Sequence, residues 1–273
     1  MSHFTILGAT GTIGQRLVSH LRALGHDVSA PARGDRTIWD RPLGHAIYTI
    51  GITADFRTKP LDTVEAHVCL LREMLARADF SSLTYLSSTR VYGSSQVGRE
   101  DAALSVDPNS ASDLYNLSKL MGESLCLHGG RAQVRAVRLS NVIGGDDAES
   151  ENFLPSLLRE AKSGGILLRS ALTSAKDYIH IDDVVAMLPR IAESGRYRLY
   201  NLASGQKISH REWTYWISAR TGCSVAVMPN APVLDFPVID ITRLREEFAF
   251  APRDVLRSVF GTLKTDISLV DPE

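Results

Sequence analysis

Residues 4–14 read Phe-Thr-Ile-Leu-Gly-Ala-Thr-Gly-Thr-Ile-Gly, a short apolar run followed by three spaced glycines. The apolar run predicts a buried strand, and residues 11–24 predict a helix. Gly8 permits a tight turn between them, Gly11 lets a pyrophosphate approach the backbone, and Gly14 lets the helix pack closely on the strand. The start of such a helix offers N–H groups and a positive dipole end to phosphates. The stretch therefore predicts a dinucleotide-binding turn.

The same alternation of strand and helix continues through the first half of the chain. Short apolar runs predict buried strands, and apolar residues repeated every three or four positions predict helices. The expected strands are 26–30, 45–50, 83–86 and 134–139, and the expected helices are 61–78 and 113–127. Strands that alternate with helices pair in parallel through right-handed crossovers. The fold class is therefore α/β, with a Rossmann-like doubly wound parallel sheet.

Two regions break this alternation. Residues 30–45 are too few for a full crossover helix, and we predict only a short strand there, at residues 37–39. After about Gly144 the predicted elements become shorter and less regular. They are helices at 153–162, 213–221 and 240–248, and strands at 178–181 and 198–202.

This change of rhythm predicts two parts. The first is an NAD(P)-binding Rossmann domain over residues 1–145, whose sheet is completed from residues 176–204. The second is a small C-terminal substrate-binding part made of residues 146–175 and 205–273.

The composition excludes several classes of protein. The 273 residues carry 30 Lys and Arg against 31 Asp and Glu, and the net charge of −1 gives no global attraction to nucleic acid or to a membrane. No apolar stretch approaches the ~18 residues of a membrane span. Three widely separated cysteines form neither a disulfide framework nor a metal-binding pattern. With no signal peptide pattern at its start, we expect a cytoplasmic protein without metal.

Tyr115 and Lys119 lie four residues apart in the helix expected at 113–127. This spacing places both side chains on one face, one turn apart. An ammonium near a phenol lowers the phenol pKa, which makes a tyrosine usable as a general acid or base near neutral pH. The alternative is a surface Tyr–Lys pair without function.

Residues 86–93 read Leu-Ser-Ser-Thr-Arg-Val-Tyr-Gly and follow a predicted central strand. Open α/β sheets bind their ligands at the carboxyl ends of the strands. The hydroxyl of Ser88 or Thr89 can therefore bond a substrate oxygen beside Tyr115. The alternative is a Ser/Thr-rich turn that only caps the strand.

These three motifs, in this order, resemble the short-chain dehydrogenase/reductase superfamily. The sequence resembles its extended branch of nucleotide-sugar epimerases, dehydratases and ketoreductases. Three further segments are similar to that branch: 138–144 (RLSNVIG), 176–184 (KDYIHIDDV) and 200–205 (YNLASG). The resemblance covers nearly the whole chain up to about residue 205.

The resemblance implies a role for each matching residue. Tyr115 would be the acid or base, and Lys119 would bind the nicotinamide ribose. Ser88 would bond the reacting oxygen, with Thr89 as its neighbour or substitute. The residues implied at the cofactor pyrophosphate are Gly8, Gly11, Thr12, Ile13 and Gly14, and those implied at the substrate are Asn141 and Lys176.

Two departures narrow this expectation. The dehydratases carry an adjacent Asp–Glu pair where this chain has Thr89 and Arg90, so dehydration is disfavoured. After the second strand, Ala32 stands where a carboxylate would bond the ribose of NAD, and Arg33 follows it. This favours NADP over NAD, unless Asp35 folds back toward the ribose. Arg33 can equally be a solvated loop charge.

The sequence therefore predicts an NAD(P)-dependent epimerase of a nucleotide-linked sugar, with Tyr115 as its acid or base. One alternative is an NADPH-dependent ketoreductase of a keto-sugar or another carbonyl compound. Another is a non-catalytic dinucleotide-binding regulator. The resemblance also implies a homodimer, formed through the helices at 61–78 and 113–127. The alternative is that the apolar stripes of these helices only face the core.

Overall fold

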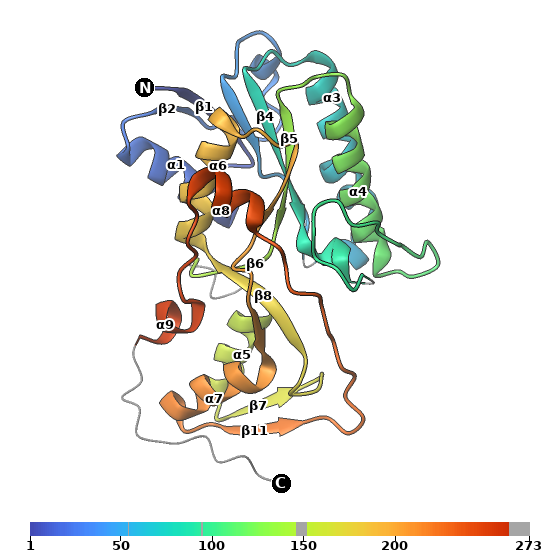
Figure 1. The fold of residues 1–273 in the computed structure, drawn as a ribbon, viewed down its shortest axis with the longest axis vertical. Coiled ribbons are helices and arrows are strands. Elements are labelled where there is room, and N and C mark those ends of the chain that lie inside the picture. Colours follow the sequence, from blue (N-terminus) through green and yellow to red (C-terminus); the bar gives the residue numbers. More distant parts are fainter. Residues whose placement is uncertain (54, 94, 146–151, 262–273) are drawn as a thin grey trace.

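The computed structural model of the chain describes residues 1–53, 55–93, 95–145 and 152–261 (Figure 1). A six-stranded sheet, parallel throughout, forms its larger part, in the order β2-β1-β3-β4-β5-β9. These strands are β1 (His3–Leu7), β2 (Asp27–Ser29), β3 (His45–Tyr48), β4 (Ser82–Ser88), β5 (Val134–Leu139) and β9 (Leu199–Leu202). This sheet confirms the fold class predicted from the sequence.

Helices cover both faces of this sheet (Figure 1). On one face lie α1 (Thr12–Ala23) and α6 (Ile181–Ser194), and on the other lie α3 (Leu70–Arg77) and α4 (Asp113–His128). Successive side chains of a strand point to opposite faces. Accordingly, Ile6 of β1 packs in the core beside α1 and α6, while Leu7 packs in the core beside α3.

Several elements differ from the sequence prediction, among them residues 37–39 and 181–194. The strand expected at 37–39 is wrong, because these residues belong to the 3-10 helix η1 (Arg36–Trp39). Asp35 accepts hydrogen bonds from both the backbone N–H and the hydroxyl of Thr37, which favours a turn over an extended chain. Helix α6 was not predicted at all, and it holds Pro189 in its interior, where proline is unusual.

The helix expected at 61–78 is confirmed, but it has three sections. A π-helical turn, η3 (Glu65–Cys69), separates α2 (Pro60–Val64) from α3. Insertions of this kind are frequent at functional sites. The turn is preceded by the 3-10 helix η2 (Asp55–Arg57).

The smaller part lies beyond the carboxyl edge of the large sheet and has its own core, which includes the fully buried Trp213 (Figure 1). Its sheets are β10-β8-β6 and β11-β7. Its strands are β6 (Asn141–Ile143), β7 (Gly165–Leu168), β8 (Ala175–His180), β10 (Lys207–Ser209) and β11 (Ser224–Val227). Its helices are α5 (Phe153–Lys162), α7 (His210–Thr221) and α9 (Val255–Phe260). Within 176–204, β9 joins the large sheet and β8 pairs in the smaller part.

Residues 232–241, which we call the crossing segment, run from the smaller part back to the larger one and lead into α8 (Thr242–Phe248) (Figure 1). At one end the carbonyl of Leu234 accepts a hydrogen bond from Ala175 N–H at 3.1 Å. At the other end Asp240 N–H donates to Gly98 O at 2.9 Å. Main-chain bonds therefore fix the segment to both parts.

Candidate functional site

The glycine turn lies where the strand order reverses, because β1 pairs with β2 on one side and β3 on the other. Gly8 has a φ of 92°, and a Cβ there would lie 2.8 Å from Thr49 Oγ1. A Cβ on Gly14 would overlap the carbonyl of Gly8. A Cβ on Gly11 would meet only that same carbonyl, at 3.6 Å. The fold itself therefore requires Gly8 and Gly14, whereas Gly11 leaves open space above the turn.

This turn fits the pyrophosphate of a dinucleotide. Gly11 caps α1 without a side chain, so no side-chain cap covers the first amides of that helix. Those amides have no acceptor within the helix and point along a dipole that favours a phosphate. Thr12 and Ile13 are the first two residues of α1, where the sequence placed them.

The structure brings Ser88, Tyr115 and Lys119 together. Ser88 ends β4, and Tyr115 and Lys119 lie one turn apart on α4, both buried. Lys119 Nζ lies 5.8 Å from the centre of the Tyr115 ring and donates a hydrogen bond to Leu86 O at 2.9 Å. The pair is therefore buried and does not lie at the surface.

The pKa of Tyr115 differs in direction from the sequence expectation. Burial raises the pKa of Tyr115, although a hydrogen bond with Ser88 and the charge of Arg90 act against this rise. Burial lowers the pKa of Lys119 to about 7, with Glu123 acting in the opposite direction. The phenol was expected to have a lowered pKa because of Lys119. Loss of hydration on burial is the largest influence on the pKa of both groups.

Arg90 is a site residue that the sequence analysis did not select. It belongs to the 3-10 helix η4 (Thr89–Tyr92), and its backbone N–H donates to Ser88 Oγ at 3.2 Å. Its guanidinium carbon lies 5.4 Å from the centre of the Tyr115 ring and 4.9 Å from that of Phe56. Its position directly after Ser88 and Thr89 was the available signal.

His67 is a second residue that the sequence did not reveal. It lies in the π-helical turn η3, fully buried, with its ring edge against Tyr115 at 5.4 Å between centres. Its Nδ1 pairs with Ser118 Oγ at 2.8 Å, and its Nε2 accepts from Ile52 N–H at 3.2 Å. Burial and the nearby Lys119 lower the pKa of His67 to about 3, so the ring is a neutral wall of the site. The apolar pattern of 61–78 gave no sign of the π-helical turn.

A buried ion pair connects the elements that carry the site residues. Arg138 of β5 bonds Glu123 of α4, with 2.7 Å between Nη2 and Oε2. Its Nη1 also donates to the hydroxyl of Tyr92 in η4 at 2.7 Å. Glu123 in turn accepts from Ser87 Oγ. The pair therefore ties β4, η4, α4 and β5 together behind Ser88 and Tyr115.

The residues expected at the substrate lie toward the smaller part. Asn141 begins β6 and donates from Nδ2 to Asp177 O at 2.8 Å. Lys176 lies on β8, with Nζ 5.3 Å from the centre of the Phe236 ring in the crossing segment. Thr89 is buried in η4. The structure shows no direct contact of Asn141 or Lys176 with Tyr115 among the residues described.

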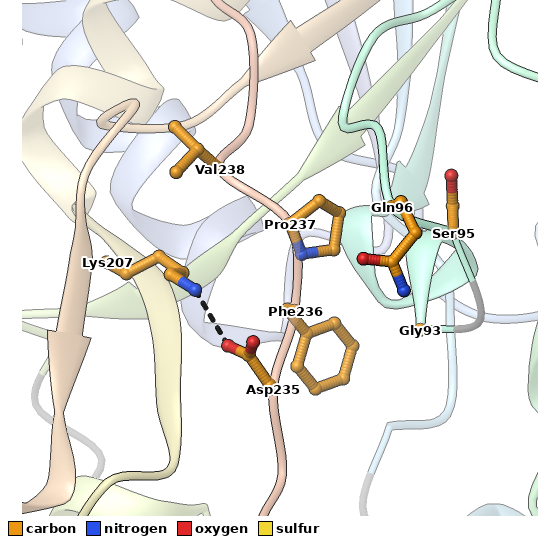
Figure 2. A pocket seen from close by; sticks show the side chains of 8 residues that line it. All are labelled: Gly93, Ser95, Gln96, Lys207, Asp235, Phe236, Pro237 and Val238. Carbon is orange, nitrogen blue, oxygen red and sulfur yellow. Dashed lines mark hydrogen bonds and ion pairs between the residues drawn. The ribbon is translucent and has the colours of Figure 1, made fainter.

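A cavity of about 390 Å³ lies between the end of η4 and the crossing segment. Figure 2 shows Phe236 between Gly93 on one side and the Lys207–Asp235 ion pair, at 2.7 Å, on the other. Its described lining includes none of Ser88, Tyr115 or Lys119. The described residues that line it are Gly93, Ser95, Gln96, Lys207, Asp235, Phe236, Pro237 and Val238.

Arg33 lies apart from these residues, exposed in the turn that follows β2. Asp35 is held by Thr37 and lies 3.8 Å from Arg41, so its carboxylate is occupied within its own loop. Within the described ranges, no three His, Cys, Asp or Glu residues are grouped to hold a metal ion. No helix among those same residues is long and apolar enough to cross a membrane.

Comparison with known proteins identifies the family. The sequence pattern of the "NAD dependent epimerase/dehydratase family" matches residues 4–203, from β1 to the end of β9. The chain belongs to this family. The epimerase/dehydratase family is one of enzymes, and the resemblance drawn from the sequence is confirmed.

Three individual proteins illustrate the similarity. A dTDP-4-dehydro-6-deoxy-D-allose reductase of Streptomyces bikiniensis is 31% identical over 149 residues, which are 51% of this chain and 46% of that relative. The chain thus spans about half the length of this relative. The structure of MoeE5 in complex with UDP-glucose and NAD superposes with a TM-score of 0.76 at 21% identity, covering 94% of this chain and 95% of that one. RMD from Pseudomonas aeruginosa, complexed with NADPH, gives 0.74 at 21% identity, covering 96% and 97%.

Proposed function

We propose that this family member is an NAD(P)-dependent enzyme that acts on a nucleotide-linked sugar by hydride transfer, with Tyr115 as its acid or base. The observation that carries the proposal is the meeting of Ser88, Tyr115 and Lys119 at the carboxyl end of the central strand β4. A bound nicotinamide ring would supply or accept the hydride. The glycine turn after β1, with Gly8, Gly11 and Gly14, lies at the same edge of the sheet and would hold the pyrophosphate.

Each of the three side chains has a separate task in this proposal. Tyr115 moves a proton between its Oη and the oxygen on the reacting carbon. Ser88 forms hydrogen bonds to that oxygen and to the phenol, consistent with its hydrogen bond to Tyr115. Lys119 binds hydroxyls of the cofactor ribose, for which a buried amine with a pKa near 7 is a suitable donor. His67 and Phe56 close the site around the phenol.

Two reactions fit these residues, and we place epimerisation first. The Ser-Ser-Thr before Val-Tyr-Gly supports it, as does the absence of a carboxylate at Thr89 and Arg90, which speaks against dehydration. Reduction of a keto-sugar is the second candidate. The reductase from Streptomyces bikiniensis supports it, and so does a Tyr115 that burial keeps protonated, ready to donate to a carbonyl oxygen.

The finer assignments are part of the same proposal. NADP is favoured because the carboxylate of Asp35 is bound within its own loop, while Arg33 stays exposed after β2. Asn141 and Lys176 would contact the nucleotide-linked substrate. The division of the chain into a dinucleotide-binding domain and a substrate-binding part, with limits at residues 145 and 205, is likewise proposed. A cytoplasmic location is proposed as well.

The proposal also includes a homodimer formed through α4, because Leu117 and Met121 are exposed on this helix.

The experiment is incubation with UDP- and dTDP-linked sugars, with and without added NADPH or NADH. Isomer formation without net consumption of the dinucleotide supports epimerisation, and stoichiometric oxidation supports reduction. Tyr115→Phe is expected to reduce kcat by at least about 100-fold, the usual contribution of a general acid or base, while the dinucleotide still binds. Turnover that survived this change would disprove the assigned role of the phenol.

A further inference from the structure

Arg90 has a charge without a counter-charge. Among the residues that the structure describes, no carboxylate pairs with its guanidinium, and only its backbone N–H forms a hydrogen bond. The half-buried side chain lies instead against the rings of Phe56 and Tyr115. Desolvation and the neighbouring Arg57 lower the pKa of Arg90. A guanidinium in such a place lacks the anion that its planar fork is suited to bind.

The groups around Arg90 do not supply that anion. Asp113 is the carboxylate that acts on the pKa of Arg90, but its two oxygens accept hydrogen bonds from Asn116 Nδ2 and Asp107 N–H, at 2.8 and 2.9 Å. Two further cations are close. Arg57 lies 4.5 Å from the centre of the same Phe56 ring, and Arg90 helps to lower the pKa of Lys176. The charges closest to Arg90 are therefore mainly positive, in a chain whose net charge is −1.

The position of Arg90 limits where its ligand can be. It is two residues from Ser88 and 5.4 Å from the Tyr115 ring centre, and these two side chains are the ones that would hold the reacting oxygen. An anion bound by Arg90 must therefore be attached close to the reacting carbon. Lys176, on β8 in the smaller part, remains for the diphosphate and binds it as a point charge.

We propose that Arg90 binds a carboxylate carried by the sugar next to its reacting carbon, so that the substrate is a nucleotide-linked uronic acid. The inference rests on the proposed function and adds the class of sugar to it. A carboxylate accepts two parallel hydrogen bonds from one guanidinium, which a neutral hydroxymethyl group cannot do.

The test compares equilibrium binding of UDP-glucuronic acid, UDP-glucose and UDP to the protein loaded with dinucleotide, by calorimetry, and repeats the acidic and neutral pair with dTDP. We expect the acidic sugar to bind about 10- to 100-fold more tightly than the neutral one, as one charge-assisted contact provides. Arg90→Gln is expected to bring this ratio close to one, and Arg90→Lys to restore part of it. Arg22→Gln, in the exposed last turn of α1 and away from Tyr115, is the control and should keep the native ratio.

The outcomes separate the possible errors. Equal binding of the two sugars by the native protein, or no binding of either acidic sugar, would overturn the inference. If Arg90→Gln weakened UDP as much as UDP-glucuronic acid, Arg90 would serve the diphosphate and the inference would also fail. Binding does not depend on turnover, so a native preference for the acid in a protein that converts neither sugar would contradict the proposed function alone. Thermal melting of Arg90→Gln checks that the variant is folded.

Discussion

At the scale of single residues, Lys119 occupies a buried position that is unfavourable for a charged side chain. Its ammonium is buried and donates a hydrogen bond to the carbonyl of Leu86, and its pKa falls to about 7. Burying a charge is unfavourable unless it is well paired. The residue therefore weakens the fold when protonated, and the proposed role at the cofactor would account for a lysine at this position.

Replacing Lys119 by Met is expected to stabilise the protein without cofactor by about 1 kcal/mol or more below pH 7. The native lysine is neutral in the folded state above about pH 7 but stays charged when unfolded up to about 10.5. The native protein therefore gains stability as pH rises between these values, and the advantage of the variant shrinks. Urea unfolding at pH 6 and pH 9 measures this. An advantage that grew with pH would contradict it.

The glycine turn permits a paired test. Gly11→Ala should leave the melting temperature unchanged, because its Cβ meets only one atom, at 3.6 Å, but should weaken dinucleotide binding by about tenfold. Gly14→Ala should destabilise the fold by about 1–3 kcal/mol, since its Cβ would overlap Gly8 O and lie 2.8 Å from Ala9 Cα. Melting curves measure the stability of each variant, and titration with dinucleotide measures its affinity. A fold disrupted equally by both changes would show that Gly11 is needed for packing.

The residues of the site differ in how far the sequence reveals them. Gly8, Tyr115 and Lys119 follow from local spacing within one turn or helix, which is fixed by backbone geometry. Arg90 and His67 do not, because their roles depend on η4 and η3 packing against α4. The place of Arg90 directly after Ser88 and Thr89 was a local signal, but the contacts of Arg90 and His67 with residues distant in the sequence leave none.

At the scale of elements, strands are best predicted where an apolar run is completely buried. β1, β3 and β5 follow the expected ranges closely, since both faces of a parallel sheet are covered. Residues 37–39 are β-branched or aromatic, yet Ile38 alone is buried and Asp35 turns the chain. Side-chain preference predicts a strand only when a neighbouring strand is present to pair with it.

The ion pair between α4 and β5 is expected to hold the site elements in place. Glu123→Gln should destabilise the protein by about 3–5 kcal/mol, because it leaves the Arg138 guanidinium buried without a counter-charge. Urea unfolding followed by circular dichroism measures the loss. The control is Asp101→Asn, which breaks the exposed pair with Arg99 and should unfold at the native urea concentration. Equal effects of the two changes would contradict the assigned importance of the buried pair.

At the scale of the whole molecule, the two parts meet at the carboxyl edge of the large sheet. The main-chain bonds of Asp240 and Ala175 fix the crossing segment to both. This attachment was not predicted from the sequence, whose resemblance to the family is vague beyond about residue 205. The reason is physical: the segment is held by backbone contacts with distant residues and has no periodic apolar pattern of its own.

The proposed homodimer gives a prediction at this scale. Light scattering should report twice the chain mass of 29.9 kDa for the native protein. Met121→Glu should return it to a single chain, because Met121 is 53% exposed on α4 and a charge there opposes apolar contact. Leu24→Glu, at the exposed end of α1, is the control and should leave the mass unchanged. A native protein of single-chain mass would contradict the dimer.

The attachment of the crossing segment has a consequence for evolution and engineering. Backbone amides and carbonyls make several of its anchoring bonds, and these bonds survive most exchanges of side chain. Meanwhile, Asp235, Phe236 and Val238 line the cavity beside η4 (Figure 2). Mutational drift can therefore alter the lining while the architecture persists, and a combinatorial library restricted to these three codons would explore new ligand preferences from an intact scaffold.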